Sequence, residues 1–423
     1  MIQLLQLRIK IILFFTIFFF TSGYSQIKVL FDATKAETAG NADWVIDSDL
    51  FNLSYSGGTV SIGGNEANPQ QIPTPAQSGI NASTPETYWK GALSSWGIDC
   101  VKQGYTVETL PYNGQITYGL SSNSQDLSRY KVFIVCEPNI VFTNAEKTAI
   151  LNFVQNGGGL FMVSDHDVSD RNNDGWDSPH IWNDLLNNNS VMTNPFGITF
   201  DYANISGASF NIVTQATDSI LHGPMGNVAE AEWFNGTTMS LNKAINPTAT
   251  GKIFTTGSSI TGTTNVMFAT AFYGKGKVAA IGDSSPCEDG TGDTGDALYN
   301  GYWTDAADNH RPLLMNATIW LATTKPSETS LNPVNELSSE IQIENPVRNH
   351  EIKISFTTNK NAKVLIELID ITGKVLRTKL HINDLNDAQF ETIKVDEINS
   401  GFYLLKISSD YNSITKLIII PNK

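Results

Sequence analysis

Cysteine is scarce in this chain of 423 residues, which contains only Cys100, Cys136 and Cys287 and no Cys-x-x-Cys pair. Three cysteines cannot build a disulfide scaffold, and their spacing is not that of a zinc site. Basic residues are few as well, because 27 Lys and Arg stand against 42 Asp and Glu. Since phosphate contacts need clustered basic side chains, this balance argues against a nucleic-acid partner or an anionic membrane.

Motifs for nucleotide cofactors and for two large hydrolase classes are also absent. The sequence has no P-loop, no dinucleotide-binding fingerprint, no Gly-x-Ser-x-Gly and no His-Glu-x-x-His. We therefore expect no nucleotide cofactor. Hydrophobic residues nevertheless make up 41% of the chain, with 8 Trp and 21 Phe, which is enough for a large packed core and excludes a disordered chain.

Long apolar runs are restricted to the N-terminus, where residues 11–20 follow two basic residues and precede a small, polar stretch. This order is typical of a signal peptide, whereas a membrane anchor would need about 20 apolar residues. We predict a signal peptide over residues 1–25 that is cut after Ser25, with a cut after Gly23 as the alternative. We expect no transmembrane span in the mature chain.

The composition changes at residues 325–340, a polar linker that carries two prolines. After it, apolar and polar residues alternate in short runs without a helical pattern. This alternation predicts a small antiparallel β-sandwich over residues 341–423. The predicted strands are Ile352–Phe356, Lys363–Ile369, Gly401–Ile407 and Lys416–Ile420.

Four features of this segment resemble the C-terminal sorting domain (type A) of the type IX secretion system. They are Asn345-Pro346, the run Ile369–Leu376, the run Ser400–Ile407 and the terminal strand Lys416–Ile420. The resemblance implies that the secretion machinery is a partner. It also implies that the protein crosses the outer membrane and is then released or held at the cell surface. An ordinary β-sandwich or a carbohydrate-binding module is the alternative.

Residues 26–324 must carry the function, and their apolar strands alternate with helices. Continuous apolar strands between helices predict a parallel sheet covered on both faces. We therefore expect an α/β fold, a flavodoxin-like three-layer sandwich with a mostly parallel sheet, and a β-rich insertion at about 194–274. The strands are expected at 27–31, 105–110, 131–136, 160–163 and 277–281, and the helices at 83–96, 143–156 and 311–322.

Three segments of this region resemble class I glutamine-amidotransferase-like domains, including the trehalose-utilisation-like group. They are Phe153–His166, Asp218–Pro224 and Gly274–Asp283. The resemblance implies a fold more than a reaction. True amidotransferases carry a cysteine at the turn after the glycine-led strand, where this chain has Ser164-Asp165-His166. Glutaminase activity is therefore not expected.

Ligands of open α/β sheets bind at the carboxyl ends of the strands, and these ends are acidic here. Crowded carboxylates persist only with raised pKa values or a bound cation, which favours acid–base hydrolysis or a divalent-metal site. Helix caps and turns are the alternative explanation for the same residues. We predict Asp165, His166 and Asp283 as catalytic residues, and as substrate contacts Asp32, Glu37, Glu137, Asp167, Ser284 and His310.

Residues 170–177 read Asp-Arg-Asn-Asn-Asp-Gly-Trp-Asp. The spacing Asp-x-Asn-x-Asp-Gly is that of a calcium loop, in which ligands alternate and glycine makes the sharp turn. An EF-hand needs Glu at the twelfth position, which is Ile181 here, so Asp177 or Asp184 would have to replace it. A polar surface loop that binds nothing is the alternative. The predicted Ca²⁺ ligands are Asp170, Asn172, Asp174, Trp176 and Asp177.

The leading hypothesis is a secreted hydrolase that acts on an extracellular glycan or a related polymer. Asp165, His166 and Asp283 would be its acid–base groups, with calcium holding the site together. Two carboxylates that flank a scissile bond suit glycoside hydrolysis. The competing hypothesis is a non-catalytic surface protein that binds glycan or serves adhesion on a degenerate amidotransferase-like fold. A secreted metal-dependent nuclease ranks third because of the acidic charge balance.

Overall fold

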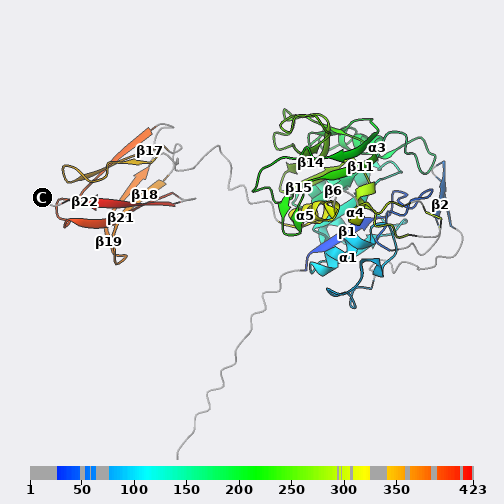
Figure 1. The fold of residues 1–423 in the computed structure, drawn as a ribbon, viewed down its shortest axis with the longest axis horizontal. Coiled ribbons are helices and arrows are strands. Elements are labelled where there is room, and N and C mark those ends of the chain that lie inside the picture. The colour runs from blue at the N-terminus through cyan, green and yellow to red at the C-terminus, as the bar shows by residue number, and fades with distance from the viewer. Residues whose placement is uncertain are drawn as a thin grey trace, which may run out of the picture. The chain divides into compact units, whose positions relative to one another are not determined.

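The chain divides into two compact units, Met1–Lys325 and Pro326–Lys423, each with its own hydrophobic core (Figure 1). The predicted signal peptide at 1–25 and the predicted linker at 325–340 lie outside the described residues. The computed structural model describes residues 26–47, 53–57, 59–62, 76–292, 295–296, 298–304, 308–323, 341–357, 363–382, 388–409 and 413–421.

The N-terminal unit is built on a nine-stranded sheet in the order β4-β1-β5-β6-β15-β14-β12-β7, with β13 paired to β14. The sheet is mixed and mostly parallel. Its parallel neighbours are β4 (Thr106–Leu110), β1 (Lys28–Asp32), β5 (Val132–Cys136), β6 (Gly159–Val163) and β15 (Gly276–Ile281). The antiparallel strands are β14 (Val266–Tyr273), β12 (Met239–Leu241), β7 (Ile198–Phe200) and β13 (Thr250–Phe254).

Numbered along the chain, the five parallel strands have the order 2-1-3-4-5, which is also the order of flavodoxin-like sheets. β5, β6 and β15 are buried along their whole length, because a hydrophobic core covers each face of the sheet. The predicted parallel sheet is therefore present, and the flavodoxin-like assignment stays a prediction.

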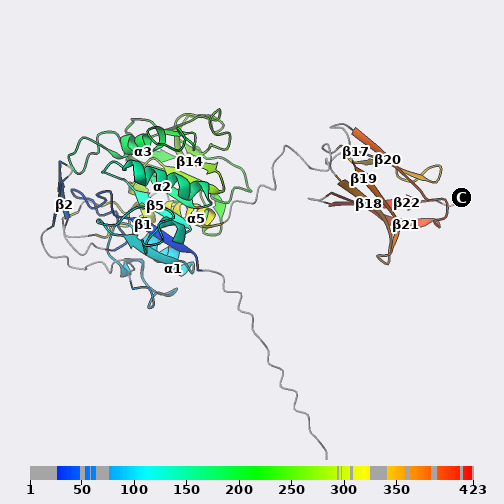
Figure 2. The ribbon, with the colours of Figure 1, turned by 180° about the vertical axis from the view of Figure 1, so that it is seen from behind.

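Helices lie against both faces of this sheet, which Figures 1 and 2 view from opposite sides. Phe161 and Val163 of β6 belong to a core that also contains side chains of α1 (Ser94–Lys102) and α5 (His310–Ala322). Leu160 and Met162 belong to a second core, with side chains of α2 (Asn144–Gln155) and α3 (Ser178–Asn187). The alternation of one strand thus separates the two cores.

The predicted helix over 83–96 is wrong in its bounds. The structure has a 3-10 turn at Glu86–Tyr88 and begins α1 only at Ser94. Two backbone amides of the stretch between them donate to carbonyls of the segment 43–47, so tertiary contacts replace the helix. Gly91 permits this approach, because a Cβ there would lie 2.3 Å from the Val45 carbonyl oxygen.

The β-rich stretch predicted at 194–274 supplies β7, β12, β13 and β14, which extend the central sheet. It also contains two short antiparallel pairs, β8 (Ile205–Ser209) with β11 (Ala231–Gly236) and β9 (His222–Gly223) with β10 (Gly226–Asn227). A further pair, β2 (Leu53–Ser56) with β3 (Thr59–Ile62), follows β1. The short helices η2 (Leu127–Arg129), η3 (Ser285–Cys287) and α4 (Gly301–Thr304) lie in connections.

The C-terminal unit consists of two antiparallel sheets. Alternate residues of their strands, among them Ile354, Ile366 and Ile407, share one buried core, as the period-two pattern predicts. One sheet contains β16 (Gln342–Ile343), β17 (Glu351–Thr357) and β20 (Ala388–Lys394). The other contains β19 (Val375–Ile382), β18 (Lys363–Asp370), β21 (Gly401–Ser409) and β22 (Ser413–Ile420).

Candidate functional site

Three neighbouring parallel strands, β5, β6 and β15, end in acidic residues at the same edge of the sheet. Glu137 follows β5, Asp165 follows β6 and Asp283 follows β15, and these residues are 0%, 3% and 0% exposed. Glu288, just beyond η3, is 3% exposed and interacts electrostatically with Glu137 and Asp283. The structure therefore brings together the strand-end acids predicted from the sequence, but it places them below the surface.

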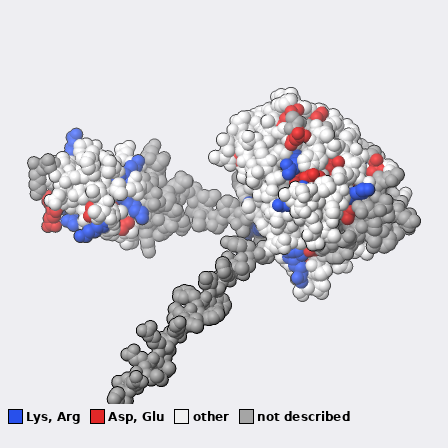
Figure 3. Space-filling model, turned by 60° about the horizontal axis from the view of Figure 1, so that its bottom comes forward, with Lys and Arg blue, Asp and Glu red and all other residues white. Residues whose placement is uncertain are grey.

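The guanidinium of Arg171 lies over these carboxylates. Its Nε is 3.1 Å from Oε1 of Glu137, and its Nη2 is 3.5 Å from Oδ2 of Asp165. The guanidinium carbon also lies 4.9 Å from the ring centre of Trp44, and Nη1 donates to Asn41 at 3.3 Å. Buried carboxylates need a partner of opposite charge, so Arg171 makes this acidic group possible. Figure 3 shows acidic and basic side chains side by side on one face of this unit.

The carboxyl groups of this cluster outnumber Arg171, and their pKa values are raised. Burial raises the pKa of Glu137, and burial with the charges of Glu137 and Asp283 raises the pKa of Asp165 well above its usual range. Burial also raises the pKa of Asp283 to about 7 and the pKa of Glu288 to about 8. Several of these groups therefore hold a proton near neutral pH, which relieves their mutual repulsion.

Hydrogen bonds fix the oxygens of Asp283 and Glu137. Asp283 accepts from the backbone amides of Phe234 and Ser285, at 2.5 and 2.9 Å. The hydroxyl of Ser284 donates to Oε2 of Glu137 at 2.6 Å. Through these hydrogen bonds, the predicted residues Asp283, Ser284 and Glu137 stabilise the loops at this edge of the sheet. Their direct contact with a substrate stays a prediction.

His166 reaches the surface beside this cluster, with 21% of its side chain exposed. Its Nδ1 lies 3.2 Å from Oδ2 of Asp165, but the approach does not form a hydrogen bond, and Nδ1 is buried without one. Burial and the charge of Arg171 lower the pKa of His166. An imidazole with a free ring nitrogen beside a carboxyl group is an arrangement that acid–base catalysis uses.

A second acidic pair is formed by Asp32, the last residue of β1, and Glu37 in the loop that follows. Burial raises the pKa of Asp32 to about 6, and burial with the charge of Asp32 raises the pKa of Glu37 well above its usual range. Thr34 donates to both oxygens of Asp32, and the amide of Lys35 donates to Glu37 at 2.7 Å. Because these contacts are local, the pair first shapes its own loop, and its substrate contact stays a prediction.

His310 is fully buried at the start of α5. Its Nε2 accepts from the amide of Glu232 at 2.9 Å, and its Nδ1 lies 2.8 Å from the carbonyl oxygen of Gly301. Its ring also stacks on Trp233, with ring centres 6.3 Å apart. With both ring nitrogens bound to the backbone, His310 supports the fold, and we assign it no contact with a substrate.

The loop predicted to bind calcium folds onto its own backbone. Both oxygens of Asp170 accept from backbone amides, those of Asp174 at 3.1 Å and Gly175 at 2.7 Å. Asp174 in turn accepts from the amide of Trp176 and from the side-chain amide of Asn172, both at 2.9 Å. Such bonds are typical of a polar surface loop, and the calcium site stays a prediction.

Asp177, the last residue of that loop, comes together with Asp167 and His180. Among the described residues, these three side chains form the group of His, Cys, Asp and Glu that could hold a metal ion together. Their ligand atoms all lie within 4.8 Å of one another. Asp177 also caps α3, because its side chain accepts the amide of His180.

Arg171 and Glu288 belong to the site but were not predicted from the sequence. Glu288 accepts from the indole nitrogen of Trp44 at 3.0 Å and from the amide of Tyr299 at 2.5 Å. Arg171 stands inside the calcium-like spacing, where it occupies a variable position. A lone arginine among strand-end acids, in a chain poor in basic residues, is the signal that could have identified it.

Residues 345–421 match the family described as the secretion system C-terminal sorting domain. This segment is a sorting domain. The match confirms the resemblance seen in the sequence and the predicted localisation. The sorting domain directs export through the type IX secretion system to the cell surface or the extracellular space. Within the part of the chain that the structure describes, no helix is long and apolar enough to cross a membrane.

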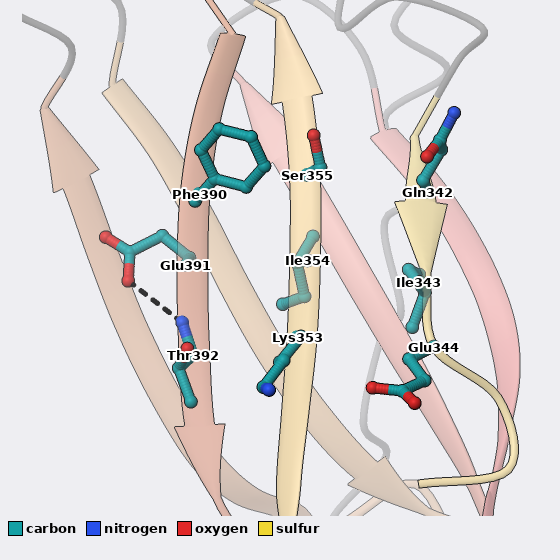
Figure 4. Close-up of a pocket in the computed structure, with 9 residues that line it drawn as sticks. All are labelled: Gln342, Ile343, Glu344, Lys353, Ile354, Ser355, Phe390, Glu391 and Thr392. Atoms are coloured by element: carbon teal, nitrogen blue, oxygen red, sulfur yellow. Dashed lines mark hydrogen bonds between the residues drawn. The ribbon is translucent and has the colours of Figure 1, made fainter. Parts of the chain in front are cut away.

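The sorting domain carries a groove of about 440 Å³ along β16, β17 and β20 (Figure 4). The exposed ring of Phe390 lies near Ser355 towards one end, and Lys353 and Glu344 lie towards the other. This mixture of apolar and charged side chains does not point to one class of ligand.

No curated protein sequence matches the chain. Nine chains of solved structures match, among them one titled "mmIFT52 N-terminal domain". That match has 14% sequence identity and a TM-score of 0.39, and it covers 70% of this chain and 97% of the other. A likeness of this size carries no functional argument, so the function of the N-terminal unit has to be inferred from its own residues.

Proposed function

We propose that the N-terminal unit is a hydrolase that acts on an extracellular glycan or a related polymer. The observation that carries the proposal is the pair of His166 and Asp165 beside the guanidinium of Arg171, at the carboxyl ends of parallel strands. Ligands of open α/β sheets bind at this edge. An imidazole can pass a proton to or from a substrate there, and a guanidinium can stabilise negative charge that develops beside it.

His166 is the proposed catalytic residue, because its side chain is partly exposed. Asp165 is 3% exposed, so we assign it as a positioning residue that holds the guanidinium of Arg171 beside the imidazole. The side chain of Arg171 is 28% exposed and can face a substrate. Its ion pair with the buried Glu137 keeps the guanidinium in place. Asp283 contributes to this proposal indirectly, because its charge raises the pKa of Asp165.

Aromatic side chains near the acidic cluster suit a sugar polymer. The rings of Phe234 and Tyr299 stack with centres 5.1 Å apart, and Tyr299 is 44% exposed. The backbone amides of these two residues donate to Asp283 and Glu288, which places the ring pair next to the cluster. Exposed aromatic faces provide apolar contact area beside polar groups, as the faces and hydroxyls of sugars require. Export through the sorting domain brings the site to extracellular polymers.

The test is a screen of the exported protein against soluble polysaccharides for the release of new reducing ends. His166→Gln should lower the rate at least about 100-fold, which is the usual contribution of a positioned acid–base group. His222→Gln is the matched control, because His222 is exposed and its Nδ1 lies 3.0 Å from Asn227 within the β9–β10 pair. Equal release by His166→Gln and the wild type would rule out the proposed role.

A non-catalytic glycan-binding or adhesion protein is the second candidate, and the burial of the acids favours it. Glu137 and Asp283 are 0% exposed, and Arg171 lies over the cluster. Retention of a polysaccharide by the protein, without release of reducing ends in the same screen, would support this function over the hydrolase.

We also propose that the N-terminal unit is a flavodoxin-like, amidotransferase-like domain without the nucleophile. The strand order 2-1-3-4-5 supports the flavodoxin-like part. Cys136 and Cys287 are 1% and 0% exposed, and burial raises the pKa of both thiols. Neither thiol is therefore suited to nucleophilic attack.

A further inference from the structure

We infer that Asp167, Asp177 and His180 form a binding site for a divalent first-row transition-metal ion such as Zn²⁺. The site differs from the calcium loop predicted at 170–177, with which it shares only Asp177. It goes beyond the proposed hydrolase and does not depend on it, because the argument rests on the donor atoms alone.

The distances between the donor atoms suit one small ion. Nδ1 of His180 lies 3.7 Å from Oδ1 of Asp167 and 2.5 Å from Oδ1 of Asp177. Zn²⁺ binds nitrogen and oxygen donors at about 2.0–2.2 Å, so donors around it lie about 3–4 Å apart. The first separation is in this range. The second is a hydrogen bond between the imidazole and the carboxylate, which an ion between the two would replace.

Contacts with the turn at 201–203 hold two of the donors in place. The ring of His180 stacks flat on Tyr202, with centres 3.9 Å apart and planes 8° apart. The backbone amide of Asp167 donates to the carbonyl of Ala203 at 3.1 Å. Because both residues are anchored to one turn, the group needs little rearrangement to bind an ion.

Asp177 is the buried member of the group, with 7% of its side chain exposed. Its Oδ2 accepts the amide of Val168 at 2.6 Å, which leaves Oδ1 facing His180. The side chains of Asp167 and His180 are 34% and 40% exposed, so an ion can enter from solvent. The site is thus buried on the side of Asp177 and open to solvent on the side of Asp167 and His180.

The donor set indicates the class of ion. Ca²⁺ and Mg²⁺ prefer oxygen ligands alone, whereas an imidazole with two carboxylates suits Zn²⁺ and its first-row neighbours. Three protein ligands also leave a coordination position for water, as in catalytic zinc sites. The charges of Asp167 and Asp177 act on His166, so the ion would lie near the proposed catalytic residue.

Titration calorimetry with Zn²⁺ on the chelator-treated exported protein tests the inference. We expect one ion per chain and an affinity lowered at least about 100-fold in both His180→Gln and Asp167→Asn. Both substitutions leave the Asp177 carboxylate that caps α3, so the helix should persist, and circular dichroism checks this. His222→Gln, at an exposed histidine, should bind as the wild type does.

The absence of Zn²⁺ binding, or unchanged binding in both variants, would overturn the inference and leave the group as the cap of α3. Binding that is lost in Asp174→Ala but kept in His180→Gln would also overturn it, because the ion would then lie in the loop at 170–177. Since binding is measured without a substrate, failure of the hydrolase proposal would show as missing polymer cleavage alongside intact Zn²⁺ binding.

Discussion

Arg171 sets the charge balance at the acidic edge of the sheet. Its guanidinium contacts Glu137 and Asp165, and both of these carboxyl groups are buried. Removing the cation leaves the carboxyl groups without their partner, and breaking a buried pair in this way costs about 3–5 kcal/mol in proteins. Arg171 therefore matters for the folded state as well as for any chemistry at the site.

Arg171→Met should lower the free energy of unfolding by about 3–5 kcal/mol, because it removes the charge and keeps much of the apolar stem. Chemical denaturation measures this loss. Arg129→Met is the matched control, since Arg129 donates to the Ser121 carbonyl at an exposed position. It should change the free energy by less than about 0.5 kcal/mol. Similar losses in the two variants would contradict the role of Arg171.

Glu288 holds a proton that the unfolded chain releases. Burial, with the charges of Glu137 and Asp283, raises its pKa from 4.5 to about 8. Between these pH values the folded chain keeps the proton, so the free energy of unfolding falls as the pH rises, by at most about 1.4 kcal/mol per pH unit. The stabilisation from this group is complete below the unfolded pKa and is lost as the pH passes the folded pKa.

Glu288→Gln should flatten the fall in stability between about pH 5 and pH 8, because the amide still accepts from Trp44 but does not titrate. Denaturant midpoints measured across this range test the effect. Glu230→Gln, at a partly exposed position, should leave the wild-type slope unchanged. Parallel curves for Glu288→Gln and the wild type would show that Glu288 does not carry this proton.

The strand-end acids could be predicted from the sequence, whereas their partners could not. Glu137, Asp165 and Asp283 follow apolar strands that are recognisable in the chain. The contacts of Arg171 and Trp44 instead join segments far apart in the sequence, 130 positions for Arg171 with Asn41 and 244 positions for Trp44 with Glu288. Local patterns carry no information about such contacts.

At the level of elements, the predictions held where periodicity dominates. The five parallel strands and the helices α2 and α5 were predicted because their apolar patterns match their burial. The helix at 83–96 was wrong, because hydrogen bonds to the segment 43–47 outweigh the local helical pattern. Gly91 makes these hydrogen bonds possible, because it lets the backbone lie close to Val45. This tertiary contact could not be predicted from the sequence.

Gly91→Ala should destabilise the N-terminal unit by about 1–3 kcal/mol, because the added Cβ would meet the Val45 carbonyl oxygen at 2.3 Å. Thermal unfolding followed by circular dichroism measures the change. Gly79→Ala is the control, since a Cβ there meets its nearest atom, the hydroxyl of Tyr88, at 3.6 Å. Equal melting temperatures for Gly91→Ala and the wild type would show that the contact is not as close as described.

At the level of the whole molecule, the two units differ in how far their roles can be predicted. The destination of the protein follows from the sorting domain, whose four sequence features lie within or next to the segment that matches its family. The chemistry of the N-terminal unit does not follow from its resemblance, because the cysteine of amidotransferases is replaced by Ser164-Asp165-His166. The contacts among the buried acids, Arg171 and His166 are visible only in the folded structure.

The rate of reducing-end release by the exported protein, measured on the polysaccharide that it degrades fastest, tests the central claim most directly. We predict that His166→Gln lowers kcat at least about 100-fold, whereas His222→Gln retains the wild-type value. If folded His166→Gln protein releases reducing ends at the wild-type rate, the site at the carboxyl ends of β5, β6 and β15 is not the catalytic centre.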